Sequence, residues 1–108
     1  MLDPQLKRGL LDICVLAALR REDSYGYQII KDLSGSVALS ESTLYPILRR
    51  LEQGGALTSY SVEHNGRLRK FYHLTPGGRQ QIRDFLDSRD ELERIFDYIQ
   101  GSVEDDEA

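Results

Sequence analysis

A chain of 108 residues is long enough for one domain with a modest core and too short for two. Charged residues make up 30% and apolar residues 40% of it, which excludes wholesale disorder, and no apolar run approaches the ~20 residues of a membrane-spanning helix. Met1–Arg8 lacks the charged-then-apolar order of a secretory signal, and the net charge of −4 excludes a uniformly basic surface.

Residues 5–20 predict a first helix that is apolar around most of its circumference. Only Asp12 is charged between Gly9 and Leu19. The apolar side chains are Leu10, Leu11, Ile13, Val15, Leu16 and Leu19. Such a helix needs burial on more than one side. Because a domain this small covers one side with its own core, we expect a partner subunit on the other.

The single cysteine, Cys14, lies in the same apolar stretch. It cannot form an internal disulfide, which fits a reducing cytoplasm and predicts a cytoplasmic protein. Because no apolar run is long enough to span a membrane, we expect no membrane partner. Its apolar neighbours favour a buried small hydrophobic residue over a reactive thiol.

A second helix is predicted after a polar turn and extends to about Leu33. Either Asp23 or Ser24 is the expected N-cap, and Ser34-Gly35 supplies the stop. Within the helix, Tyr27, Ile30 and Leu33 recur at helical spacing.

A third helix is predicted to begin at Ser40 and to end at Gly54-Gly55. Ser40 is the expected N-cap, and Leu39 and Leu44 occupy the positions of a hydrophobic staple. Pro46 removes a backbone donor inside the helix, so we expect a slight kink or a loosened first turn there. The inward stripe consists of Leu44, Ile47, Leu48 and Leu51.

The other side of this helix carries small hydroxyls, a tyrosine and arginines. Short hydroxyls and free backbone N–H groups near a helix N-terminus suit phosphate oxygens and base edges, and arginine reaches a phosphate or a guanine. These features favour a DNA recognition helix, although solvated amphipathic helices also carry such residues. The candidate contacts are Ser42, Thr43, Tyr45, Pro46 and Arg49, with Arg50 beside them.

Two strands, 57–63 and 68–74, are predicted around Asn65-Gly66. Asn-Gly between two alternating runs is a strong hairpin signal, because a type I′ turn requires positive φ at both central residues. A two-residue turn pairs His64 with Arg67, Val62 with Arg69 and Leu57 with Leu74. Leu57, Leu68, Tyr72 and Leu74 then share one face, with Leu68 near the tip and the others over the core.

Arg67, Arg69 and Lys70 crowd this hairpin, and only Glu63 offsets them. Basic residues at a hairpin tip also serve solubility or protect an edge strand. After a helix-turn-helix pattern they are typical of a wing that contacts double-stranded DNA. The predicted fold is therefore mainly α with a small β-hairpin: a winged helix-turn-helix with a C-terminal dimerisation helix.

The two histidines, His64 and His73, lie on the hairpin without cysteines or a carboxylate cluster nearby in the sequence. A structural metal site needs about four ligands, so we expect neither metal nor cofactor. The sequence contains no glycine-rich phosphate loop, paired acidic motif or nucleophile elbow, so we expect no catalytic residues and no enzyme activity.

The last helix is predicted to begin at Thr75-Pro76, with the threonine as cap, and to end near Gln100. Its apolar stripe exceeds what a small core can cover and is interrupted by Arg89. This favours a dimer arm over a helix packed on its own domain. The stripe comprises Ile82, Phe85, Leu86, Leu92, Ile95, Phe96 and Ile99. The expected dimer contacts are Leu10, Ile13, Phe85, Leu92, Ile95, Phe96 and Ile99.

The acidic balance belongs to the C-terminal part of the chain. Residues 1–83 carry 12 basic against 8 acidic residues (+4), and residues 84–108 carry 2 against 10 (−8). The acidic face of the last helix, which we expect to be solvated, comprises Asp84, Asp87, Glu91 and Asp97. We expect a winged helix-turn-helix domain at 1–75, a dimerisation helix at 76–101 and an acidic, disordered tail at 102–108.

The chain resembles the PadR family of bacterial transcriptional regulators over about residues 5–80. The matching segments are Ser24-Tyr-Gly-Tyr27, Ser40-Glu-Ser-Thr-Leu-Tyr-Pro46, Arg50-Leu-Glu52 and Gly66-Arg-Leu-Arg-Lys-Phe-Tyr-His-Leu-Thr75, with Gly78. Several motifs in the right order make the resemblance specific. The short C-terminal helix is similar to the compact subgroup of the family.

The resemblance implies a winged-helix homodimer, mostly a repressor, that binds palindromic promoter DNA and is often released by a small aromatic or drug-like effector. By position it implies that Thr43, Tyr45 and Pro46 fall in the recognition helix and that Arg67, Arg69 and Lys70 fall in the wing. Some compact members hold flat drugs between paired tryptophans, and this chain has no tryptophan. Phe85, Phe96 or Tyr98 would have to serve another ligand.

Two other functions remain open from the sequence. A winged helix can be a protein-interaction module that binds no DNA, but such a module would not need three cations on its wing. A sensor in which ligand binding dominates would need a sizeable apolar cavity between subunits.

Overall fold

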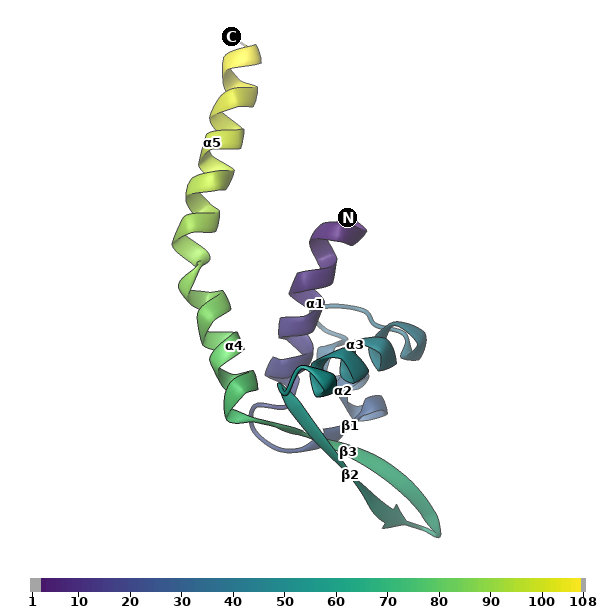
Figure 1. Ribbon diagram of the computed structural model, residues 1–108. Coiled ribbons are helices and arrows are strands. Elements are labelled where there is room, and N and C mark those ends of the chain that lie inside the picture. Colours follow the sequence, from purple (N-terminus) through teal and green to yellow (C-terminus); the bar gives the residue numbers. More distant parts are fainter. Residues whose placement is uncertain (1–2, 108) are drawn as a thin grey trace.

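The computed structural model describes residues 3–107, which form five helices and a three-stranded sheet (Figure 1). The elements are α1 (Pro4–Ala18), β1 (Ser24–Tyr25), α2 (Gly26–Leu33), α3 (Glu41–Gln53), β2 (Leu57–His64), β3 (Arg67–Leu74), α4 (Pro76–Asp87) and α5 (Arg89–Glu107). The predicted fold class, mainly helical with a β-hairpin after the third helix, is confirmed.

The hairpin has the predicted register. His64 pairs with Arg67, Val62 with Arg69 and Leu57 with Leu74. Asn65 and Gly66 have φ values of 51° and 78°, as a type I′ turn requires. Both strands come one residue closer to the turn than predicted, and β1 adds a short third strand on the other side of β3.

The core lies where α1, α2, α3 and the root of the hairpin meet. The inward stripe of α3 is buried as predicted, and Leu57, Tyr72 and Leu74 of the hairpin pack over it. From α1 the core receives Leu11, Val15, Leu16 and Leu19. Cys14 is half-buried, not fully buried as expected, because it lies beside the inward face of α1.

The start of α2 differs from the prediction. Ser24 pairs with Tyr72 in the sheet, so it does not cap the helix, and the N-cap is Tyr25 with no side-chain hydrogen bond. The buried residues of the helix are Gly26 and Ile29, and the predicted Ile30 and Leu33 are partly buried against the core. The predicted Tyr27 is instead 64% exposed. The pairing with β3 extends the backbone at Ser24 and Tyr25, which sequence-local capping rules do not anticipate.

The caps of α3 and α4 were predicted correctly. The Ser40 hydroxyl accepts a hydrogen bond from the Thr43 N–H at 3.3 Å. The Thr75 hydroxyl accepts one from the Gly78 N–H at 3.0 Å, with proline at the first helical position. Helix α3 continues through Pro46.

The predicted single C-terminal helix is divided in two at Ser88. The Ser88 hydroxyl donates to the Phe85 carbonyl at 2.6 Å, and the Ser88 N–H reaches the same carbonyl at 3.2 Å, which closes α4 in a tight turn. Asp90 and Glu91 then lie in the first turn of α5, where acidic side chains favour the helix dipole.

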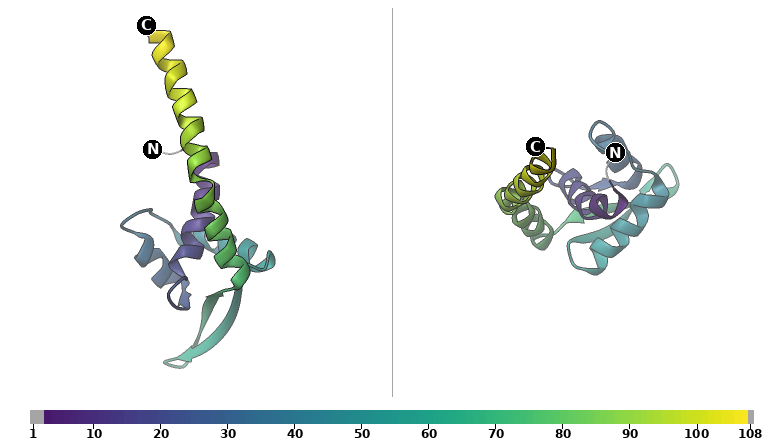
Figure 2. Two further views of the ribbon diagram at one scale, coloured as in Figure 1. Left: turned by 90° about the vertical axis from the view of Figure 1, so that its left-hand side faces the viewer. Right: turned by 90° about the horizontal axis from the view of Figure 1, so that it is seen from above.

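Helices α4 and α5 form an arm that projects past the N-terminus of α1, while the hairpin projects from the opposite end (Figures 1 and 2). The principal extents are 66 × 26 × 21 Å, and the radius of gyration of 17.2 Å exceeds the ~13 Å of a compact chain of this length. The tail expected to be disordered is helical to Glu107, and Val103 within it continues the apolar stripe of α5. None of the helices over residues 3–107 has both the length and the apolar character needed to cross a bilayer.

Candidate nucleic-acid interface

A groove of about 830 Å³ separates the start of α2 and one side of α3 from the hairpin. Its lining comes from three elements that are far apart in the sequence. The residues are Tyr25, Gly26 and Tyr27 around the start of α2, Tyr45, Arg49 and Glu52 on α3, and His64, Asn65, Arg67, Leu68, Arg69, Lys70 and Tyr72 on the hairpin. The recognition helix and the wing therefore face a common concave surface.

Of the five residues predicted on α3, Tyr45 and Arg49 line this groove. Ser42, Thr43 and Pro46 are exposed on the same helix but do not line it. The hydroxyls at the helix start take part in the cap: Ser40 Oγ lies 3.0 Å from Ser42 Oγ and donates to Thr43 Oγ1 at 3.1 Å. Thr43 therefore keeps its own hydroxyl proton for an outside acceptor.

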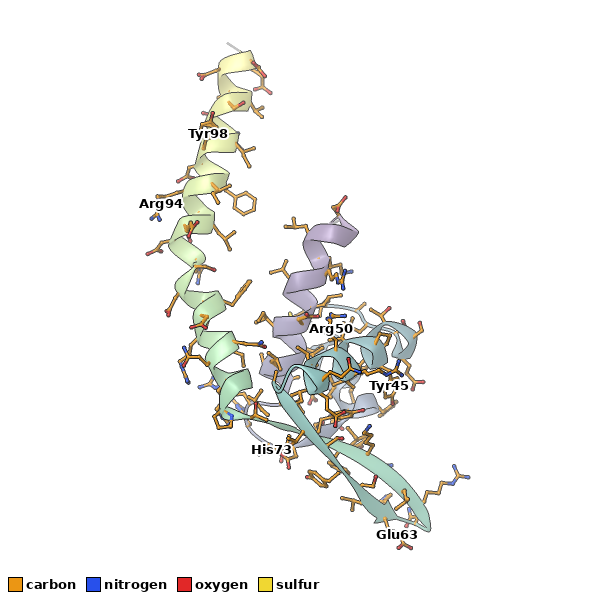
Figure 3. The ribbon with its side chains drawn as sticks, in the orientation of Figure 1. Tyr45, Arg50, Glu63, His73, Arg94 and Tyr98 are labelled. Carbon is orange, nitrogen blue, oxygen red and sulfur yellow. The ribbon has the colours of Figure 1, made fainter. Side chains whose placement is uncertain are left out.

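Arg50 does not lie with the candidate DNA contacts, although it follows Arg49 in the sequence. It forms an ion pair with Asp12 of α1 at 2.5 Å, and in Figure 3 it lies between α3 and α1, away from the hairpin. Arg50 therefore ties α3 to α1 and is not part of the groove lining.

All three predicted wing cations line the groove. Arg69 stacks over the Tyr25 ring, with its guanidinium carbon 4.2 Å from the ring centroid. Lys70 lies on the core-facing side of β3, with Nζ 3.8 Å from Glu52 and 5.6 Å from the centroid of Tyr72. Arg67 is exposed near the tip.

The charge of the groove is positive although the chain is acidic. Four cations line it, namely Arg49, Arg67, Arg69 and Lys70, against the single carboxylate of Glu52. Burial, and next the nearby Glu52 carboxylate, raises the pKa of the Tyr72 hydroxyl, so Tyr72 stays neutral and able to donate. The acidic residues of α5 lie on the arm, far from this surface (Figure 3).

Gly26 also lines the groove, although it was not among the site residues predicted from the sequence. A Cβ atom at Gly26 would lie 2.5 Å from the Tyr45 hydroxyl oxygen. The absence of a side chain therefore lets Tyr45 lie against the start of α2. In the sequence, Gly26 could have been noticed as a glycine between two tyrosines, Tyr25 and Tyr27, which also line the groove.

The face of the hairpin that is turned away from the core, called here the outer face, carries an aromatic row. Tyr25, Phe71 and Tyr60 follow one another across the three strands, with ring centroids 5.3 and 5.8 Å apart. Asp23 lies beside them and accepts a hydrogen bond from the Tyr60 hydroxyl at 2.6 Å, and its other oxygen lies 2.8 Å from His73 Nδ1. These bonds, that from Tyr60 first, lower the pKa of the Asp23 carboxyl, and the same bond raises the pKa of Tyr60.

The residues predicted for dimerisation lie along α1, α4 and α5. Leu10, Ile13 and Phe85 are half-buried, whereas Leu92, Ile95, Phe96 and Ile99 are 40–59% exposed. Within residues 3–107, no group of three or more histidine, cysteine or acidic side chains could hold a metal ion.

Comparisons with known proteins agree with this geometry. Transcriptional regulator Rv3488 of Mycobacterium tuberculosis is 31% identical over 91 residues, covering 83% of this chain and 85% of the relative. The structure of a transcriptional regulator from Clostridium thermocellum superposes with a TM-score of 0.78 at 28% identity, covering 90% of this chain and 96% of that one.

A third similar structure is that of Bacillus subtilis PadR in complex with operator DNA. Its TM-score is 0.65 at 27% identity, and the match covers 70% of this chain and 46% of that one. The sequence pattern that describes the PadR-like family of transcriptional regulators matches residues 15–84. With its winged helix-turn-helix and its basic groove, the chain belongs to the PadR-like family of transcriptional regulators.

Proposed function

We propose that this protein binds a specific DNA sequence through the groove between α3 and the hairpin. The observation that carries the proposal is the convergence of four cations from two elements on one concave surface of an otherwise acidic chain. Arg49 on α3 is suited to a base edge or a phosphate, and Arg67 and Arg69 are suited to the backbone. The operator complex of Bacillus subtilis PadR supports this assignment by likeness.

The protein acts as a homodimer in this proposal. Support comes from the arm, where the apolar residues Leu92, Phe96, Ile99 and Val103 recur every three or four positions and are all 40–59% exposed. Such a repeat is the pattern of helices that pair with another helix. A twofold dimer through α1 and the arm would set two recognition helices about one DNA turn, roughly 34 Å, apart on a palindromic site.

The regulator is a repressor that responds to a small effector. A hollow of about 520 Å³ between α1, the end of α3 and α4 supports the effector, because Ile13 and Phe85 of the proposed dimer face line it together with Asp12 and Arg50. The repressor role rests on the resemblance to the PadR family. An aromatic molecule that binds there and prefers another dimer spacing would lower operator affinity through its differential affinity for the two states.

The test is a fluorescence anisotropy titration of the protein against a duplex from the region upstream of its own gene, at several salt concentrations. Wild-type protein should bind more weakly as salt rises, with a slope of about −0.9 per phosphate neutralised. The double substitution Arg67→Ala with Arg69→Ala should weaken binding and reduce that slope by about 2. The charge-matched control is Arg83→Ala with Arg94→Ala on the arm.

Three results would contradict the proposal, the first as a whole and the other two in one part each. Low salt, about 50 mM, strongly favours contacts to phosphates. If the wild type does not bind DNA there, the protein-interaction module is the better description. An unchanged slope in the wing double variant would remove the wing from the contact. Sedimentation of the wild type as a monomer at the concentrations used would reject the dimer.

A further inference from the structure

One carboxylate on the outer face bridges both strands of the hairpin. Asp23, in the loop before β1, accepts from the Tyr60 hydroxyl of β2 at 2.6 Å and lies 2.8 Å from the His73 ring of β3. These contacts join residues 37 and 50 positions apart in the chain. Figure 3 places His73 at the root of the hairpin, well away from Glu63 near the tip.

A second carboxylate makes the equivalent bridge on the core-facing side. Glu52 of α3 accepts from the Ser59 hydroxyl of β2 at 2.5 Å and pairs with Lys70 of β3 at 3.8 Å. The hairpin root is thus held on its two faces by one acid each, Glu52 from the recognition helix and Asp23 from the loop before β1. This support matters because a two-stranded hairpin is marginal in water by itself, and residues 61–68 of this one are all exposed.

The Asp23 contacts also lead to the recognition helix. Two residues after Asp23, Tyr25 pairs with Phe71 of β3 and carries Arg69 on its ring. The next residue, Gly26, is the one on which the Tyr45 side chain rests. A short path therefore connects the hairpin root, Asp23, β1 and a groove residue of α3.

We propose that Asp23 is a positioning residue for DNA binding, which holds the wing at the angle that lets Arg67 and Arg69 reach the same duplex as α3. The inference rests on the proposed DNA-binding function and assigns no DNA contact to Asp23 itself. Without the bridge, the hairpin keeps its ladder to β1 and its inner tie to Glu52, but its outer face is released. The wing cations then sample orientations in which they miss the phosphates.

Electrostatics and positioning predict changes of opposite sign in DNA affinity for the substitution Asp23→Ala, so one titration can separate them. Asp23→Ala removes a negative charge from a protein that binds a polyanion, so electrostatics alone predicts tighter binding. Positioning predicts weaker binding, by about tenfold, with a salt slope lower by 1 to 2 because up to two phosphate contacts are lost. The matched control is Asp32→Ala on α2, whose exposed carboxylate accepts a hydrogen bond from the Gln28 amide at 2.7 Å and lies on no strand of the hairpin.

The measurement is anisotropy of a labelled duplex from the protein's own upstream region at four salt concentrations, with full-length wild type and both variants. Asp32→Ala should bind as the wild type does or slightly more tightly. Asp23→Asn, which keeps an acceptor oxygen for Tyr60, should recover most of the affinity lost in Asp23→Ala. If Asp23→Ala binds as tightly as Asp32→Ala with the same slope, the inference is wrong.

Tyr60→Phe keeps the inference testable if Asp23→Ala fails to fold. It deletes one of the two bonds to Asp23 without changing charge, and its ring can still stack on Phe71. We expect about threefold weaker DNA binding and an unchanged melting temperature, and wild-type affinity in this variant would overturn the proposal. Failure of the wild type to bind DNA would instead reject the proposed function, so the two failures are distinguishable.

Discussion

The winged domain and the arm both have helices with apolar side chains every three or four positions, but these side chains are buried in the winged domain and exposed on the arm. In α3 the apolar positions Leu44, Ile47, Leu48 and Leu51 are 0–6% exposed, because α1, α2 and the hairpin root cover them. In α5 the corresponding positions, Leu92, Phe96, Ile99 and Val103, are 40–59% exposed, and no residue of that helix is buried. Periodicity therefore predicts that a face needs cover but does not say whether the same chain provides it.

The largest effect is expected where the cover is complete. Leu48→Ala removes a side chain with 0% exposure from the centre of the core and should lower the free energy of unfolding by about 3 kcal/mol. Urea denaturation followed by circular dichroism would measure it as a lower midpoint at unchanged slope. Leu86→Ala on the arm, 57% exposed in the wild type, is the control and should change the midpoint of the winged domain little.

A glycine near the boundary of the two regions should also be costly to replace. A Cβ atom at Gly78 of α4 would lie 2.3 Å from the Ala56 carbonyl oxygen and 2.5 Å from a Leu74 methyl group. Because a backbone atom cannot move aside cheaply, Gly78→Ala should destabilise the fold by about 2 kcal/mol. A melting temperature at or above that of the wild type would show that α4 does not pack closely against Ala56 and Leu74.

On the arm, substitution should affect association and leave the winged domain folded. Phe96→Ala removes the most exposed phenylalanine of the stripe and should weaken the dimer by about 2 kcal/mol, roughly thirtyfold in Kd. Sedimentation velocity over a concentration series would measure this. Tyr98→Ala on the same helix, 78% exposed and outside the stripe, should leave the dimer intact, and equal weakening by both would contradict the assigned face.

A smaller gain is expected at Gly101 of α5. Apart from its chain neighbours and the backbone of its own helix, no atom of residues 3–107 lies within 4 Å of a Cβ built there, so Gly101→Ala should stabilise the arm by about 0.5–1 kcal/mol through helix propensity. Far-ultraviolet circular dichroism should show a small rise in helicity and in melting temperature. The opposite signs expected at Gly78 and Gly101 would measure directly how differently the two helices are packed.

The smallest effect is expected at Ser24. Its hydroxyl is buried without a hydrogen-bond partner among the described residues, so it contributes a desolvation cost and no compensating bond. Ser24→Ala should be neutral or stabilising by up to about 1 kcal/mol in urea denaturation. A clear loss of stability would indicate that the hydroxyl has a partner in solution.

The features predicted correctly from the sequence depend on neighbouring residues. The Ser40 and Thr75 caps and the Asn65-Gly66 turn lie within four residues of the groups they organise, so their chemistry is visible in a short window. The turn also predicted which side chains of the hairpin face the core, because a two-residue connection fixes the register of both strands.

The missed features depend on contacts between distant residues. Ser24 enters a strand because Tyr72 pairs with it. Arg50 lies away from the groove because it pairs with Asp12, which is 38 residues away in the sequence and outside any local pattern. The break at Ser88 could have been found, because Ser88 and Glu91 have the spacing of a helix-start motif. The groove is lined by the start of α2 as well as by α3 and the wing, and the sequence analysis predicted only the residues of α3 and of the wing.

Ala56 lies where the start of the arm, the end of α3 and the wing meet. The Ala56 N–H donates to the Leu51 carbonyl at the end of α3, and its carbonyl accepts from Thr75 just before α4. Ala56 is also the last residue before the wing begins, so it adjoins three elements. Because α5 alone spans 19 residues, or about 28 Å, a rotation of ~5° at its start would carry its far end through about 2 Å.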